Sequence, residues 1–280
     1  MVQYSGTTMK YELKPLNVGG ILDQAILILK DHFGLFLKIT LCLQIPVGIA
    51  LNLLITQKQP IPSPNATPEE MQAFLQTQFL FLFTVLMPLL LLMMVLVVPI
   101  MSAAIVHATA CVYLGEPTSV GSAFRVGIER AVPLIWTWIL VYFFTFVGLM
   151  LCILPGILMS FWFALATTVA VVERVFGVSA LQRSRHLMRA DWANHYLTFF
   201  LLGILMFFIN AGIGAGSAFV FERHVASIVS VLLQAVTGTF GSIAMVVFYF
   251  SCRCRVENFD LMRLAEAVAA APTEPAENLA

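Results

Sequence analysis

Residues 79–114 read FLFLFTVLMPLLLLMMVLVVPIMSAAIVHATACVYL, and this stretch decides the fold class. It contains no Lys, Arg, Asp or Glu. A membrane helix needs about 20 mostly apolar residues, because the hydrocarbon core is about 30 Å thick and a helix rises about 1.5 Å per residue. The stretch exceeds that length and contains Pro88 and Pro99. We therefore predict a kinked or strongly tilted membrane helix that extends beyond the bilayer.

The composition of the whole chain agrees with a membrane protein. Of its 280 residues, 60% are hydrophobic and 11% are charged, with 15 basic and 15 acidic side chains. A soluble domain is roughly half apolar and about a quarter charged. These values exclude a disordered chain, a nucleic-acid binder and an ordinary soluble enzyme, and they make the lipid bilayer the first expected partner.

Five more apolar stretches complete an all-α, polytopic integral membrane protein with six transmembrane helices. Together with residues 79–114 they give a domain over residues 1–269, followed by a disordered cytoplasmic tail at 270–280. Residues 57–78 form the non-cytoplasmic loop, in which Thr67-Pro68-Glu69-Glu70 is typical of a helix start. Pro155-Gly156 predicts a sharp turn. The five stretches are residues 33–56, 131–154, 157–176, 196–221 and 225–251.

The basic residues predict the orientation of these spans. Six spans place both termini on one side, and that side then holds every Lys and Arg except Lys58 and Arg223. The positive-inside rule makes that side cytoplasmic. The first 32 residues contain no leading apolar stretch, so we expect no secretory signal peptide and a location in the cell membrane.

Three short amphipathic helices are predicted before the odd-numbered spans, beginning near Asn17, Thr118 and Phe176. Val120, Phe124 and Ile128 form an apolar stripe on the second, whereas Val178, Leu181, Met188 and Trp192 form one on the third. Such helices lie in the interface with basic residues toward anionic head groups. An interfacial helix followed by two spans would be a threefold repeat. The alternative is that loop helices recur at such places in any polytopic protein.

Glu173 is the most informative single residue. If the fourth span extends through residue 176, Glu173 lies about one turn inside the membrane boundary, where an unpaired carboxylate is costly. We expect it to meet Arg183 or Arg185, or to cap the helix at residues 177–190. The group Glu173, Arg183, Arg185 and Arg189 is then either a structural clamp or a site for a lipid head group or a protein partner. Separately, Gly212 and Gly216 predict a close approach of two helices.

No catalytic motif is found in the chain. Its five His residues form no metalloprotease motif, no nucleophile elbow or phosphate-binding loop occurs, and no carboxylate pair lies within the spans. The five Cys residues are scattered through apolar stretches, without the spacing of a metal site or a disulfide framework. We therefore expect a protein that is not an enzyme and that uses no metal or cofactor.

Three motifs give a resemblance to a known family. They are residues 14–23 (KPLNVGGILD), residues 154–192 with LPGI, AVVER and GVSALQRS, and residues 253–261 (RCRVENFDL). The chain resembles the membrane-domain family named after glycerophosphoryl diester phosphodiesterase, although Ser251 stands where that family usually carries an acid. In some members of that family the module is fused to a soluble phosphodiesterase domain that performs the hydrolysis, a (β/α)₈ barrel of about 250 residues that we do not expect within this apolar sequence, whereas many members stand alone. The resemblance implies a membrane module of unassigned biochemistry.

Two classes of function remain open. The first is a non-enzymatic membrane module that binds lipid, above all anionic phospholipid head groups at the cytoplasmic face, or a protein partner. The second is a transporter or permease component for an amphiphilic or small substrate. A continuous polar cavity at mid-membrane separates them, because only the second class requires one.

Overall fold

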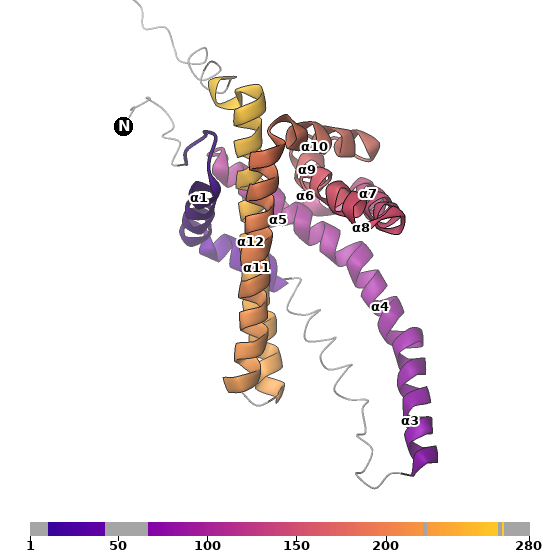
Figure 1. Ribbon diagram of the computed structural model, residues 1–280. Helices are drawn as coiled ribbons and strands as arrows, with labels where there is room; N and C mark the ends of the chain where they lie inside the picture. Colours follow the sequence, from indigo (N-terminus) through magenta and orange to yellow (C-terminus); the bar gives the residue numbers. More distant parts are fainter. Residues whose placement is uncertain (1–10, 43–66, 221–222, 263–264, 266–280) are drawn as a thin grey trace, which may run out of the picture.

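The computed structural model describes residues 11–42, 67–220, 223–262 and 265, and within them every regular element is a helix (Figure 1). A long rod, the α11–α12 hairpin and a group of shorter helices make up the described molecule. The helices are α1 (Val18–Asp31), an unlabelled helix Phe33–Cys42, α3 (Pro68–Phe81), α4 (Met87–Leu92), α5 (Val98–Tyr113), α6 (Val120–Glu129), α7 (Ala131–Leu151), α8 (Ile153–Trp162), α9 (Ala166–Val172), α10 (Val178–Ala190), α11 (Trp192–Val220) and α12 (Arg223–Glu257).

Five helical stretches in the described residues are long and apolar enough to cross a membrane. They correspond to the second to sixth predicted spans, so the chain is described as a multi-pass membrane protein. The predicted first span, residues 33–56, begins with the short apolar helix Phe33–Cys42, and its remainder lies outside the described residues. The first span, and with it a total of six spans, and the tail at residues 270–280 stay predictions. The five stretches are Pro68–Tyr113, Ala131–Leu151, Ile153–Val172, Trp192–Ser217 and Ile228–Glu257.

The longest stretch is a rod of 46 residues, with two π-helical segments at Leu82–Leu86 and Met93–Val97. Each segment lies just before a proline, Pro88 or Pro99. Proline has no N–H to donate, and its ring clashes with the carbonyl four residues earlier, so the helix widens there instead of breaking. The predicted long helix is thus present, and it begins at Pro68 with Thr67 as its cap, where the sequence predicts a helix start, so residues 68–78 of the predicted loop are helical. Thr67 and Glu70 form a capping box at its start.

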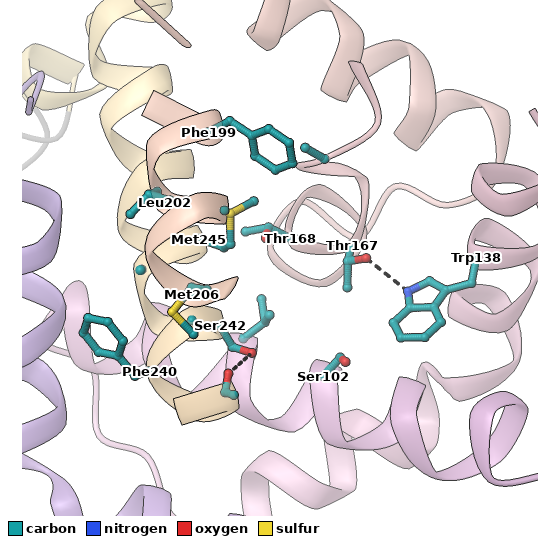
Figure 2. Close-up of a pocket in the computed structure, with 16 residues that line it drawn as sticks. Ser102, Trp138, Thr167, Thr168, Phe199, Leu202, Met206, Phe240, Ser242 and Met245 are labelled. Carbon is teal, nitrogen blue, oxygen red and sulfur yellow. Dashed lines mark hydrogen bonds between the residues drawn. The ribbon is translucent and has the colours of Figure 1, made fainter. Parts of the chain in front are cut away.

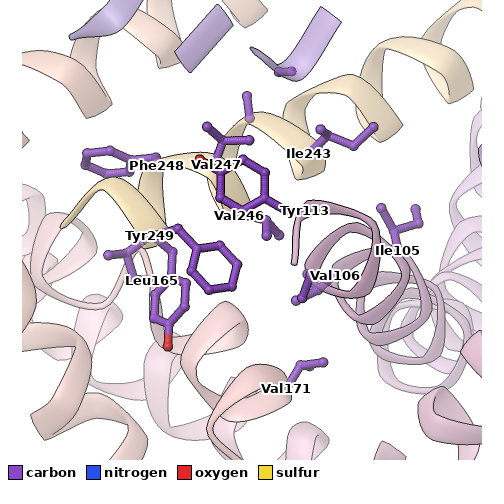
Figure 3. Close-up of a cluster of buried hydrophobic side chains, with 14 of the residues drawn as sticks. Ile105, Val106, Tyr113, Leu165, Val171, Ile243, Val246, Val247, Phe248 and Tyr249 are labelled. Atoms are coloured by element: carbon purple, nitrogen blue, oxygen red, sulfur yellow. The ribbon is translucent and has the colours of Figure 1, made fainter. Parts of the chain in front are cut away.

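The buried core surrounds the C-terminal half of α12. Its large buried side chains include Ile243, Phe248 and Tyr249, which pack beside α5 and α9 (Figure 3). The first helix, α1, packs on the same part of α12. Ser251 joins the N-terminal segment to it, because its Oγ accepts a hydrogen bond of 2.8 Å from the backbone N–H of Leu16. A hydroxyl therefore serves as an acceptor where the resembled family usually has an acid.

Short helices occur where the sequence predicts them, and of the stripe predicted on α6, Val120 and Phe124 pack against the core whereas Ile128 does not. Asn17 caps α1 and Ser119 caps α6, whereas α10 follows Gly177 without a side-chain cap. On α6 the buried residues are Ala123 and Gly127, and the predicted stripe residue Ile128 is 63% exposed. An added Cβ at Gly127 would lie 2.7 Å from the carbonyl oxygen of Ile100, so α6 crosses α5 closely. The threefold repeat remains a prediction.

The ends of the fourth span also differ from the prediction. The turn between α7 and α8 is at Cys152, which has an extended backbone, and not at Pro155-Gly156. Gly156 instead lies inside α8, where Gly148 of α7 approaches it closely. The span ends at Val172, because Arg174 adopts a left-handed backbone conformation with φ of 59°. The predicted extension through residue 176 is therefore wrong, and Glu173 is the residue directly after the helix.

Candidate functional site

The fourth span is broken in its middle. Helix α8 ends at Trp162 and α9 begins at Ala166, with Phe163–Leu165 in a turn between them. A break frees backbone carbonyls, which need partners in a low-dielectric environment. Ser184 of α10 supplies one, because its buried hydroxyl donates to the carbonyl of Trp162 over 2.7 Å. Helix α10 is thereby fixed against the break.

The carboxylate of Glu173 is held by groups from two helices. Arg183 of α10 donates to both of its oxygens, with Nε–Oε2 at 2.8 Å and Nη2–Oε1 at 3.0 Å. Tyr249 of α12 donates its hydroxyl to Oε1 over 2.7 Å. The side chains of Glu173 and Arg183 are 16% and 26% exposed. The structure therefore brings together Glu173 and Arg183 from the predicted group.

Two residues of α12 complete this network. Glu257 accepts from Arg183 and, over 3.0 Å, from Nε of Arg253. The Arg253 guanidinium also lies 4.1 Å from the ring centre of Phe259, which favours a cation–π contact. Burial lowers the pKa of Arg183, but hydrogen bonds and charges from Glu173 and Glu257 outweigh it, so its pKa lies above the usual value. Two acids thus neutralise two arginines at the junction of α9, α10 and α12.

A separate ion pair joins the end of α10 to α12. The Asp191 carboxylate accepts from Nη1 of Arg255 over 2.6 Å and from Nδ2 of Asn194 over 2.9 Å. These hydrogen bonds hold the pKa of Asp191 below its usual value. The three arginines between α10 and α12, namely Arg183, Arg253 and Arg255, are therefore all paired with carboxylates.

Arg185 and Arg189 are placed differently. Their guanidinium carbons lie 4.5 and 5.9 Å from the ring centre of Trp162, and both residues are exposed. In the described part of the chain, neither forms an ion pair with a carboxylate. Gln182 and His186 are exposed beside them, and the four side chains line a shallow depression. We call these four residues the basic face of α10.

A cavity of about 360 Å³ lies beside the break, between the α11–α12 hairpin and helices α5, α7 and α9 (Figure 2). Residues from all five candidate spans line it. Its wall is mostly apolar and includes Phe199, Leu202 and Met245. Four hydroxyl-bearing residues also reach it, but none of the lining residues is charged. One of them, Thr167, accepts a hydrogen bond of 3.0 Å from the indole N–H of Trp138.

Two expectations about packing are not met by the geometry. A Cβ added at Gly212 or Gly216 would meet no described atom within 4 Å, so the structure shows no close helix approach at this motif. Of the stripe predicted over residues 178–192, Leu181 and Met188 of α10 are buried, whereas Val178 and Trp192, the first residue of α11, are 52% and 67% exposed. Arg183 turns inward to Glu173, which is one of the pairings that the sequence predicts.

Sequence reasoning missed four residues of this region: Trp162, Tyr249, Arg253 and Glu257. The last three follow one another at intervals of four, which places them on one face of a helix. That spacing could have predicted a polar ridge on α12 that requires a partner. No comparable signal marks Trp162, because its position depends on where the fourth span breaks.

Comparison with known proteins gives a single match. Residues 142–274, just under half of the chain, match a family described as a domain of unknown function (DUF8558). The matched region contains the whole charge network and the basic face of α10. No curated protein and no solved structure matches. The resemblance to the glycerophosphoryl diester phosphodiesterase membrane domain thus gains no support from these comparisons.

Proposed function

We propose that this protein is a non-enzymatic membrane module that binds an anionic phospholipid through the basic face of α10. The observation that carries the proposal is the different pairing of the arginines. Arg183, Arg253 and Arg255 are paired with carboxylates, whereas Arg185 and Arg189 are stacked near Trp162 with no carboxylate beside them in the described chain. Two guanidinium groups held in place and left unpaired match the chemistry of a phosphate.

The position of Trp162 supports a lipid rather than a soluble anion. It is the last residue of α8, whose exposed side chains include Leu154 and Leu158, so its ring holds the two arginines beside an apolar surface of the molecule. Arginine side chains at such places extend their charge toward the head groups while their stems cover apolar surface. A phospholipid offers both a phosphate for the guanidinium groups and hydrocarbon for the surrounding surface.

Lipid retention tests this proposal. The variant Arg185→Gln/Arg189→Gln removes two charges from the basic face, and Arg125→Gln is the matched control because Arg125 is an exposed arginine on α6 paired with Glu129. Each basic residue near an anionic surface contributes about 1 kcal/mol, so the double variant should bind phosphatidylglycerol roughly 30-fold more weakly. Native mass spectrometry in detergent with added phosphatidylglycerol or phosphatidylcholine measures the retained lipid.

The proposal expects the wild type and Arg125→Gln to retain phosphatidylglycerol in preference to phosphatidylcholine, and the double variant to lose that preference. Equal retention of both lipids by the wild type would refute it, as would an unchanged preference in the double variant. Because the interaction is ionic and partly exposed, raising the salt concentration should also weaken the preference.

A transporter or permease component is the second candidate. The broken fourth span and the cavity beside it favour this class, because broken helices and sites near the midplane are features of transporters. The uncharged wall of the cavity argues against a charged substrate, which would lose its hydration without gaining partners. Protein-dependent transbilayer movement of a fluorescent phosphatidylglycerol in proteoliposomes would favour the transporter, whereas the binding module predicts none.

A further inference from the structure

We infer that the cavity between the α11–α12 hairpin and helices α5, α7 and α9 holds one acyl chain of a membrane phospholipid. This inference extends the proposed lipid-binding function but depends on different residues. It concerns the hydrocarbon chain and the interior of the helix bundle, whereas the basic face of α10 concerns the head group. Either idea can therefore fail without the other.

The depth of the cavity is the first argument. Every lining residue belongs to one of the five candidate spans. Gly203 lies near the middle of Trp192–Ser217, and Gly238 lies about ten residues inside Ile228–Glu257. At about 1.5 Å per residue, both glycines are on the order of 15 Å from the start of their spans. In a hydrocarbon core about 30 Å thick, that distance corresponds to the middle of the bilayer.

The chemistry of the wall is the second argument. The lining residues are uncharged, and the larger ones are apolar, among them Val106, Leu202, Met206 and Phe240. Two of the four hydroxyl groups at the wall are already engaged, since Thr167 accepts from Trp138 and Ser242 donates to the carbonyl of Gly238. Such a wall offers little to an ion or to ordered water, which needs several polar partners. A hydrocarbon chain needs none.

The size and opening of the cavity are the third argument. Its volume of about 360 Å³ falls within the usual range for ligand sites of roughly 300–1,000 Å³. The cavity is partly open and not enclosed, so a chain from the surrounding bilayer can enter sideways. An empty cavity would leave its apolar wall without dispersion contacts over its whole surface. The molecule at highest concentration at this depth is the phospholipid, and its acyl chain has the required shape and polarity.

Two glycines keep this space open and provide the test. A Cβ added at Gly203 or at Gly238 would meet no described atom within 4 Å, so a larger side chain at either position would enter the cavity without a backbone clash. Gly212 is the matched control. It lies on the same helix as Gly203, its added Cβ also meets nothing within 4 Å, and it does not line the cavity.

The test measures contact between Trp138 and brominated acyl chains, because Trp138 lines the cavity and bromine quenches indole fluorescence at short range. In one background Trp138 is the only tryptophan, with Phe at positions 136, 162 and 192. In a second background Trp192, which is 67% exposed, is the only one and reports contact with bulk lipid. Both are placed in nanodiscs containing a low fraction of phosphatidylcholine with a 9,10-dibromostearoyl chain.

We expect stronger quenching of Trp138 than of Trp192, saturating as the brominated lipid increases. Gly238→Leu should remove this excess, because a leucine displaces about three or four methylenes and should weaken chain binding roughly a hundredfold. Gly212→Leu should leave it unchanged. Trp138 quenching no greater than that of Trp192, or an excess that survives Gly238→Leu, would overturn the inference.

Two further measurements keep the result decisive. If Gly238→Leu fails to fold, Gly203→Leu fills the same cavity from the other helix and carries the same expectation. Brominated phosphatidylglycerol then separates the two proposals. Excess quenching by the phosphatidylcholine probe supports the acyl-chain site whatever the head group. A further increase with phosphatidylglycerol, lost in Arg185→Gln/Arg189→Gln, belongs to the basic face of α10.

Discussion

Replacing Glu173 by glutamine should destabilise the protein far more than replacing an exposed glutamate of similar geometry. Glu173 accepts hydrogen bonds from Arg183 and Tyr249, and its side chain is only 16% exposed. Glutamine keeps the shape but removes the charge. It also presents an amide N–H₂ where the network requires an acceptor, so at least one donor of Arg183 or Tyr249 loses its partner.

The structure sets the expected magnitude. Removing one member of a buried ion pair costs about 3–5 kcal/mol, since the other charge remains buried without its partner. Two features reduce that cost here: Arg183 is 26% exposed, and it retains Glu257 as a second carboxylate. We therefore expect a loss of about 2–3 kcal/mol in the free energy of unfolding. At about 2–4 °C per kcal/mol for a chain of this size, Tm should fall by roughly 4–12 °C.

Thermal unfolding in one detergent, followed by tryptophan fluorescence, measures the difference. The matched control is Glu129→Gln, because Glu129 forms an equally short ion pair, 2.7 Å from Nε of Arg125, on the exposed surface of α6. Solvent screens that pair, and we expect no measurable shift in Tm. Equal shifts for Glu173→Gln and Glu129→Gln would refute the reasoning, since burial would then not decide the contribution of the network.

Two further predictions concern the helix contacts around the site. Gly127→Ala should destabilise the protein by about 1–3 kcal/mol, because its Cβ would lie 2.7 Å from a backbone carbonyl oxygen of α5. The control is Gly121→Ala on the same helix, where the added Cβ meets open space and should not change the stability. Equal Tm values for the two variants would contradict this prediction. The hydrogen bonds from Asn194 and Arg255 that lower the pKa of Asp191 should stabilise the fold above the unfolded pKa of about 3.9. That contribution is lost as pH falls through the lower folded pKa, so wild type and Asp191→Asn should differ in Tm at pH 6, and the difference should shrink progressively as pH falls below about 4.

Local composition was enough to predict the membrane helices. Long apolar stretches are visible in the sequence because lipid, and not a specific neighbour, is their solvent. The ends were less predictable. They depend on single backbone conformations, such as the extended Cys152 and the left-handed Arg174, that composition does not specify. The break at Phe163–Leu165 has the same origin, because no proline or glycine marks it.

Apolar stripes were a poor guide to helix packing for a physical reason. In water, the large apolar face of a helix must be covered by protein, whereas in a membrane it can face lipid. Helix α6 therefore buries Ala123 and Gly127 against α5 and leaves Ile128 exposed. Small residues alone are no guarantee of contact either, since Gly212 and Gly216 meet no described neighbour while Gly127 and Gly148 do.

The helical period explains how α10 can serve both as a structural element and as a binding surface. Arg183 and Arg185 are two residues apart, which is about 200° around a helix, so they point to opposite sides. Arg185 and Arg189 are four apart and share a side. Once Arg183 pairs with Glu173 and Ser184 holds the carbonyl of Trp162, the rotation of α10 is fixed. The other two arginines must then face outward over Trp162 at the break in the fourth span, beyond which Ala164 and Thr167 line the cavity. The charge network thereby fixes the basic face of α10 next to a broken helix that also lines the cavity, an arrangement that would suit an amphiphile if both proposals hold.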